Sequence, residues 1–231
     1  MTRQFERIER LLGQEGVQKL HDSHVLVVGL GGVGSYCLES LIRSGIGKLT
    51  IADFDTVDET NLNRQLQTLR ENIGAKKTDI FIERAKAINP DVEIRAFEMF
   101  VNKETANSLF DTDYDYVADC IDSTEGKITL WKICQEKQIP FVASLGMANR
   151  LDPQKVIITK LNRTTGDPLA KNLRYLAKKE GLSLDIDVVF SSEQPIIVSQ
   201  TKSALGSMMF VPASAGLTCG YQIVRGILER K

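Results

Sequence analysis

The sequence predicts an α/β protein with a doubly wound, mostly parallel sheet and helices on both faces. Short apolar segments alternate with longer amphipathic ones along most of the 231 residues, as in parallel sheets with crossover helices. After residue 147 strands and helices are still expected, and no linker or change of composition marks a boundary. We therefore expect one domain over residues 1–231, with a nucleotide-binding core at 5–145 and a C-terminal extension on the substrate side at 146–231 packed on the same domain.

Each element follows from the spacing of its apolar residues. An amphipathic helix is expected first, over residues 5–20. The expected strands are 25–28, 48–52, 92–97, 116–120, 141–144, 156–159 and 188–190. The expected helices after the first are 33–43, 76–88, 103–109, 124–136, 168–179 and about 208–228. The helix at 76–88 should stop at Asn89-Pro90, because proline disfavours helical backbone in the residue before it.

The charge, the lengths of the apolar runs and the cysteine positions exclude several classes of protein. The chain has 29 basic and 30 acidic residues, so its total charge does not indicate a nucleic-acid-binding protein, although a local basic face is compatible with it. No apolar run reaches the roughly 18–20 residues that span a bilayer, and the first residues lack a signal-peptide core. The four cysteines lie in apolar patterns outside C-x-x-C pairs, which favours buried free thiols over a zinc site. We expect a cytoplasmic protein with no membrane partner.

A glycine-rich segment lies between the first expected strand and the next helix. It reads Gly29-Leu-Gly31-Gly32-Val-Gly34. Glycine permits a tight turn and close approach of the backbone to phosphate, and the helix amino terminus offers unpaired N–H groups to the anion. All four glycines are therefore expected at the phosphate site of a Rossmann-like fold. Asp53 ends the next expected strand, where an acid usually binds the ribose. These features alone fit NAD.

Polar residues beyond that strand favour ATP instead. Asp55 completes an Asp-Phe-Asp motif, which could hold both a ribose and a metal-bound water. Asn61, Arg64 and Gln65 follow at the ligand-binding edge expected of the sheet, and Lys77 opens the next helix. A triphosphate that loses pyrophosphate needs cations to neutralise its charge, whereas a dinucleotide needs little beyond the helix terminus. Taken together, these residues predict an ATP site.

A second acidic motif ends a later strand, at Asp119-Cys-Ile-Asp122-Ser123. Asp122 is expected to face the crevice, where its carboxylate would hold Mg²⁺ through oxygen ligands. Ser123 fits two roles equally well, as a nucleotide contact or as the cap of the following helix.

Together these motifs resemble those of the ubiquitin-activating-enzyme-like adenylyltransferases, which are built on a ThiF-type adenylating domain. The resemblance covers residues 5–145 and implies a homodimer in which an arginine of the leading helix reaches the active site of the partner subunit. Arg10 is the best candidate for that arginine and Arg7 the second. The resemblance further implies that catalysis depends on Arg10, Arg64, Lys77 and Asp122. ATP would be bound by Gly29, Gly31, Gly32, Gly34, Asp53, Asp55, Asn61, Arg64, Gln65, Lys77 and Ser123.

The second half is similar to one branch of this superfamily, the tRNA threonylcarbamoyladenosine dehydratases. The motifs are Gly166-Asp-Pro-Leu-Ala-Lys171 and Val189-Phe-Ser-Ser-Glu193. This similarity implies ATP-dependent cyclisation of the modified adenosine beside the tRNA anticodon, through adenylation of its carboxylate and with net loss of water. The tRNA contacts expected from it are Arg163, Lys171, Arg174 and Lys178, with Arg150, Lys160 and Lys179 nearby in the sequence.

The alternative enzyme class is an adenylyltransferase that activates the carboxyl terminus of a ubiquitin-like sulfur-carrier protein with the same ATP residues. Sulfur-carrier enzymes often carry paired C-x-x-C motifs, which this chain lacks. Some members of the dehydratase branch have a cysteine before the final helix, whereas residues 199–206 here contain none, so we expect a mechanism without a covalent or persulfide step through that cysteine. A sulfur-acceptor or carrier protein is thus kept only as an alternative partner. The presence of Arg64, Lys77 and Asp122 argues against an inactive nucleotide-binding subunit. A dehydrogenase is the least favoured class, because the sequence shows neither a hydride-transfer site nor a substrate domain.

Overall fold

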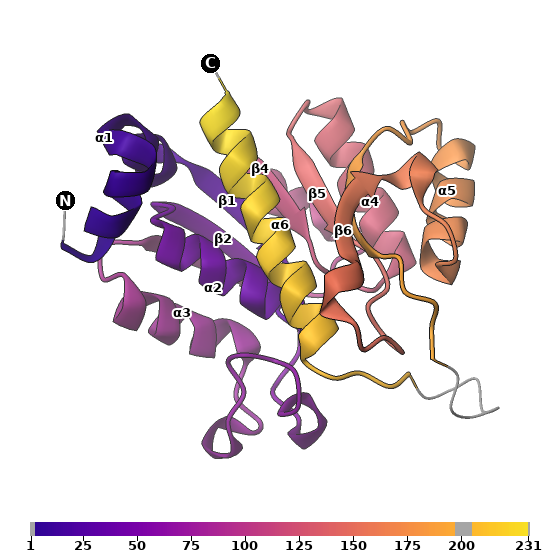
Figure 1. Cartoon of the computed structure of the whole chain (residues 1–231), viewed down its shortest axis with the longest axis horizontal. Helices are drawn as coiled ribbons and strands as arrows, with labels where there is room; N and C mark the ends of the chain where they lie inside the picture. Colours follow the sequence, from indigo (N-terminus) through magenta and orange to yellow (C-terminus); the bar gives the residue numbers. More distant parts are fainter. Residues whose placement is uncertain (1–2, 197–204, 231) are drawn as a thin grey trace.

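The computed structural model describes residues 3–196 and 205–230, which form a seven-stranded sheet covered by helices on both faces (Figure 1). The strands are β1 (His24–Val28), β2 (Lys48–Asp53), β3 (Glu93–Glu98), β4 (Tyr116–Asp119), β5 (Phe141–Ser144), β6 (Val156–Lys160) and β7 (Asp187–Ser191). The helices are α1 (Glu6–Asp22), α2 (Gly34–Ser44), α3 (Lys77–Ile88), α4 (Thr124–Glu136), α5 (Pro168–Lys179) and α6 (Phe210–Glu229). The α/β fold class is confirmed.

The strand order is β3-β2-β1-β4-β5-β7-β6, and among these seven strands β6 alone runs antiparallel to its neighbour. β1 therefore lies between β2, which follows it in the chain, and β4, which comes much later. In the register of these strands Val28 faces both Ala52 and Asp119. In open α/β sheets, ligands bind at such a switch in strand order, outside the carboxyl ends of the strands.

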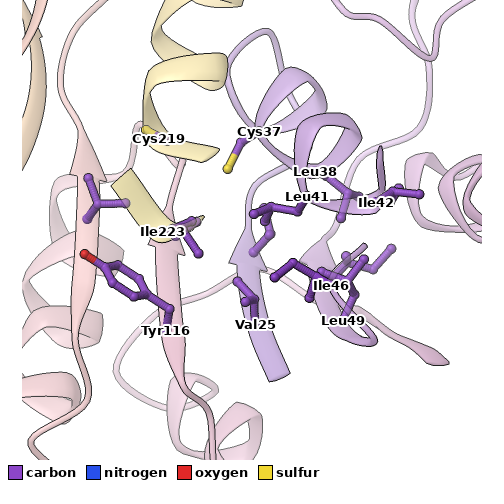
Figure 2. Packing of buried hydrophobic residues seen from close by; sticks show 14 of the residues in the cluster. Val25, Cys37, Leu38, Leu41, Ile42, Ile46, Leu49, Tyr116, Cys219 and Ile223 are labelled. Carbon is purple, nitrogen blue, oxygen red and sulfur yellow. The ribbon is translucent and has the colours of Figure 1, made fainter. Parts of the chain in front are cut away.

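Two apolar layers hold the helices on the sheet, and alternate residues of β1 belong to different layers. Val25 and Val27 pack in the layer formed with α1, α2, α3 and α6. Leu26 and Val28 pack in the other layer, with α4 and α5. Figure 2 shows part of the first layer, where side chains of α2 and of α6 gather over Val25 and Tyr116. The sheet is thus doubly wound, and strands of both halves of the chain share it.

Helix α6 packs closely on α2, because it carries glycine at the contact positions. A side chain at Gly216 would collide with the carbonyl oxygen of Val33, and one at Gly220 would collide with the hydroxyl of Ser40. The two helices therefore approach closely enough to bury Cys37 and Cys219 between them. None of the described helices has the length and apolar character needed to cross a membrane.

Two expected elements differ in the structure. The leading helix is interrupted at Gly13, whose φ of 72° and ψ of 169° are not helical. The helix expected at 103–109 is wrong, because only a short 3-10 turn forms there, at Ala106–Phe110. The side chain of Asn102 accepts hydrogen bonds from the backbone of Glu104 and Thr105 and so replaces helical bonds at that point. Most of the cysteine-free segment 199–206 lies outside the described residues.

Candidate functional site

A cavity of about 940 Å³ opens at the carboxyl ends of the central strands, a volume in the usual range for small-molecule sites. Its first wall comes from the glycine-rich turn after β1, the end of β2 and the segment from Thr60 to Gln65. Its second wall comes from residues 144–150 after β5 and from the first residues of α5. The loop after β4, residues 120–123, lies at the junction of these walls. The nucleotide-binding part and the extension expected from the sequence thus line one cavity.

The glycines of the turn have two different structural roles. Gly29 has a φ of 89°, and a Cβ there would lie 2.9 Å from the backbone of Cys120. A side chain at Gly34 would collide with the carbonyl oxygen of Gly29. By contrast, Gly31 faces open space, and a Cβ there would meet nothing nearer than Gln65 Nε2 at 4.0 Å. Gly29 and Gly34 therefore shape the turn, while Gly31 leaves its backbone accessible to a phosphate.

Asp53 connects the end of β2 to the glycine-rich turn. Its carboxylate accepts hydrogen bonds from the backbone N–H of Leu30, at 2.6 Å, and of Asp55, at 2.8 Å. Burial raises the pKa of Asp53, and the positive charge of Lys77 opposes that shift. Because each carboxylate oxygen has a second lone pair, Asp53 keeps acceptors for a ribose hydroxyl at the cavity.

Lys77 is a buried cation in the cavity wall. It is 2% exposed, and its Nζ lies 2.7 Å from Asp55 Oδ2. The backbone N–H of Lys77 also donates to the carbonyl oxygen of Asp55. This pair places an ammonium group at the first turn of α3, beside Asp53 and within the same cavity. A buried ammonium of this kind can bind phosphate oxygens with little competition from water.

The loop between β2 and α3 presents the other polar residues of the motif. Arg64 Nη1 donates to the carbonyl oxygen of Thr60 at 2.8 Å and to Asn63 Oδ1 at 2.9 Å. Asn61 Oδ1 accepts a hydrogen bond from the backbone N–H of Asp58 in a capping box. Gln65 is 6% exposed beneath the glycine-rich turn. The loop conformation is thus fixed by local hydrogen bonds, with one guanidinium nitrogen occupied.

Asp122 and Ser123 follow β4 at the junction of the two walls. The Asp122 side chain is exposed at the cavity. Ser123 caps α4, since its hydroxyl accepts from the N–H of Gly126 at 3.2 Å, and it also lines the cavity. Asp122 and the glycine-rich turn line the same cavity, and proteins usually hold Mg²⁺ through one or two carboxylates together with substrate phosphates. The residues present therefore fit the ion.

Sequence reasoning missed a buried polar cluster beneath this junction. Lys127 of α4 and Asp119 of β4 are both 0% exposed, and their charged atoms lie 2.9 Å apart. Lys127 also donates to the carbonyl oxygen of Ser144 at 2.7 Å, and Trp131 Nε1 donates to Asp119 at 2.8 Å. Lys127 therefore connects the carboxyl end of β4, which leads into the loop at the junction, with the carboxyl end of β5, which leads into the second wall. The sequence signal that could have indicated this cluster is the position of Lys127 on the apolar face of the helix predicted over 124–136.

A second missed cluster stiffens the wall made by the extension. Arg150, expected near tRNA, is 6% exposed, so that expectation is corrected. Its guanidinium donates to the carbonyl oxygens of Gly146 and Glu193 and pairs with Asp167 at 3.4 Å. Asp167 in turn caps α5 through the N–H of Ala170. Glu193 and Asp167 lie 43 and 17 residues from Arg150 in the chain, so no local pattern indicated these two pairings.

The basic residues expected to contact tRNA have different environments. Arg163, Lys171 and Lys178 are exposed. Arg174 is partly buried and donates to the backbone of Thr164 at 3.0 Å, so it also fixes α5 to the preceding turn. Lys160 pairs with Asp187 at 3.0 Å.

Arg10 lies on α1 and does not line the cavity of its own chain. Its side chain is 79% exposed and reaches Glu6 at 4.0 Å.

Comparisons with known proteins agree with this geometry. The model of the ThiF family matches residues 2–213. The tRNA threonylcarbamoyladenosine dehydratase of Bacillus subtilis is 39% identical, over 99% of this chain and 96% of its own length. The structure of the Escherichia coli enzyme in complex with AMP superposes with a TM-score of 0.92 at 34% identity, covering 97% of this chain and 94% of that one. The same enzyme in complex with ATP gives a TM-score of 0.91 at 34% identity, covering 97% and 93%. The chain therefore belongs to the ThiF family, in the branch of the tRNA threonylcarbamoyladenosine dehydratases.

Proposed function

We propose that this protein uses ATP to dehydrate threonylcarbamoyladenosine beside the tRNA anticodon. The observation that carries the proposal is the single cavity in which a phosphate-binding turn faces a second wall made by residues 144–150 and the start of α5. ATP would occupy the first wall and the modified nucleoside the second. The E. coli relative, whose structures contain ATP and AMP, supports the choice of nucleotide.

In this proposal the residues of the first wall hold ATP while the substrate carboxylate attacks its α-phosphate. The backbone at Gly31 and Gly32 would bind phosphates, and Asp53 would bind the ribose. Phe54 and Phe100 form an aromatic pair with ring centroids 4.9 Å apart beside Asp53, where the adenine would lie. Asn61, Arg64 and Lys77 would contact the phosphates, with the two cations stabilising the charge that develops as pyrophosphate leaves.

The second step needs no nucleophile from the protein. A nucleophile in the substrate side chain would attack the activated carbonyl and expel AMP, so that ring closure is intramolecular. The buried pair of Arg150 and Asp167 would keep the second wall in the shape that holds the side chain folded for closure. Mg²⁺ held by Asp122 would, when bound, neutralise phosphate charge. Residues 5–145 would thus bind the nucleotide and 146–231 the substrate side of one domain.

The proposal is tested by supplying purified protein with ATP, Mg²⁺ and tRNA that carries threonylcarbamoyladenosine. Mass spectrometry of the digested nucleosides should show loss of one water, together with release of AMP and pyrophosphate. Arg64→Ala should abolish both products while keeping the circular dichroism of the wild type. An unchanged nucleoside, with pyrophosphate exchange only when a sulfur-carrier protein is added, would establish the alternative activity. Because the substrate is tRNA, the proposed place of action is the cytoplasm.

We further propose that the active enzyme is a homodimer in which Arg10 acts on the partner's active site. The exposure of Arg10 and its position outside the cavity of its own chain support this arrangement. In a purified heterodimer of one Arg10→Ala chain and one Lys77→Met chain, a single site would contain both intact residues. We expect each homodimer to be inactive and the heterodimer to recover activity from that one site. An inactive heterodimer would show that Arg10 acts within its own chain, and an active Arg10→Ala homodimer would show that Arg10 does not act in the reaction.

A further inference from the structure

Helix α5 begins at the cavity and runs away from it. Asp167, Pro168 and Leu169 line the cavity, and Tyr175 follows two turns later, about 10 Å along the axis from Pro168 at 1.5 Å per residue. Tyr175 is 67% exposed, one of the most exposed large hydrophobic side chains of the described residues. The helix therefore connects the proposed reaction site to an exposed aromatic ring.

Lysines surround this ring on the same helix face. Lys171 and Lys178 stand four residues before and three residues after Tyr175, which places the three side chains on one side of the helix. Both lysines are exposed. On the opposite side α5 is fixed by buried Leu173 and by the hydrogen bond from Arg174 to Thr164. The exposed face is thus a rigid row of cation, aromatic ring and cation.

Such a row matches single-stranded RNA more closely than it matches a folded protein surface. Unpaired bases stack on tyrosine side chains, while lysines neutralise the phosphates beside them. The other strongly exposed tyrosine, Tyr221 on α6, has Arg225 over its ring at 5.9 Å and does not line the cavity. Helix α6 also has a cavity-lining residue near its start, Pro212, but of these two tyrosines only Tyr175 has an exposed lysine both before and after it on the same helix face.

We propose that Tyr175 is a stacking platform for an unpaired base of the anticodon loop, with Lys171 and Lys178 on the adjoining phosphates. The inference rests on the proposed function, since the substrate nucleoside enters the cavity while a neighbouring base of the same loop lies on α5. Tyr175 would thus contribute to selecting the RNA substrate, a role that the residues of the ATP site do not have.

The test compares steady-state kinetics of three variants on modified tRNA. Tyr175→Ala should raise KM for tRNA between about 5-fold and 150-fold, the range for loss of one stacked base, with kcat and KM for ATP unchanged. Tyr175→Phe should keep the wild-type KM, because stacking does not need the hydroxyl. Tyr221→Ala, which removes a ring that is 57% exposed on α6, should also keep the wild-type KM.

A direct readout uses an anticodon stem-loop RNA with 2-aminopurine at successive loop positions. Binding should quench the fluorescence at one position in the wild type and not in Tyr175→Ala. An unchanged KM in Tyr175→Ala, or a KM in Tyr175→Phe that rises as much as in the alanine variant, would overturn the stacking role. If the wild-type protein removes no water from any modified tRNA, the proposed function itself fails. This outcome differs from failure of the stacking role, in which the wild type is active and the Tyr175 variants change KM in the wrong way.

Discussion

Replacing Lys77 by methionine is expected to lower kcat for pyrophosphate release about 100-fold to 1,000-fold, as loss of one preorganised charge-stabilising donor does. Lys77 is 2% exposed and lines the cavity beside the glycine-rich turn. Methionine retains the length and most of the apolar stem, so the wall keeps its shape while the charge is lost. Single-turnover release of pyrophosphate from labelled ATP measures the effect.

Lys76 provides a matched control, because it is the neighbouring residue and its exposed ammonium pairs with Glu98 at 2.6 Å. Lys76→Met should leave the rate close to that of the wild type. A second variant separates catalysis from charge balance, since Lys77 also neutralises Asp55. If neutralisation were its only role, Lys77→Met combined with Asp55→Asn would restore activity. We expect the double variant to stay inactive, and restoration would contradict a catalytic role.

Replacing Lys127 by methionine is expected to lower the free energy of unfolding by about 3–5 kcal/mol, the usual cost of removing one partner of a buried ion pair. Asp119 would be left 0% exposed without its countercharge, and the carbonyl of Ser144 would lose a donor. For a domain of this size the melting temperature should fall by roughly 6–20 °C. Urea denaturation followed by circular dichroism gives the free energy directly.

The pH dependence of this loss identifies Asp119 as its cause. Desolvation raises the pKa of Asp119, and Lys127 and Trp131 oppose that shift. Without Lys127 the pKa of Asp119 rises further. In the folded variant Asp119 therefore keeps a proton that the same side chain releases in the unfolded chain above a pH of about 4. The folded variant is therefore relatively stable in acid, and its deficit grows as the pH rises toward the elevated folded pKa.

Two variants on the same cluster and helix complete this test. Adding Asp119→Asn to Lys127→Met should recover part of the stability at neutral pH and abolish the extra pH dependence. Lys132→Met removes a half-exposed lysine of α4 whose contact with Glu180 is 4.0 Å long, and it should unfold close to the wild type. Equal stability of the Lys127 and Lys132 variants would mean that the buried pair contributes nothing.

Much of the first wall could be predicted because its residues belong to short, continuous motifs. The turn from Gly29 to Gly34 shows its strand and helix in the flanking apolar spacing, and Asp53 and Lys77 stand at the ends of neighbouring elements. The structure brings Gly29, Gly31, Gly32, Asp53 and Lys77 to one cavity, whereas Gly34 does not line it and packs against the backbone of Gly29. Their roles toward ATP stay predictions.

The rest depends on pairs that only folding brings together. The backbone carbonyl of Ser144 accepts from Lys127, 17 residues away, and that of Glu193 accepts from Arg150, 43 residues away. One sequence carries no sign of which buried cation meets which distant acceptor. For the same reason the burial of Arg150 could not be predicted, and the sequence favoured a position near tRNA because basic residues are frequent in this part of the chain. Ser123 shows the opposite situation, because both roles expected for it fit the structure, with a capping bond and a place in the cavity wall.

The close contact of α6 with α2 has a consequence for biosynthesis. Pro212 of α6 stands directly behind Gly32, and a Cβ on that glycine would lie 3.2 Å from the proline ring. α2 ends at Ser44 and α6 begins at Phe210, so a ribosome adding 5–20 residues per second makes α6 roughly 10–30 s after α2. During that interval the apolar face of α2 is uncovered, which makes the nascent chain a natural client for chaperones. The backing of the glycine-rich turn arrives only with α6, so a chain that ends before α6 lacks the contact between Pro212 and Gly32.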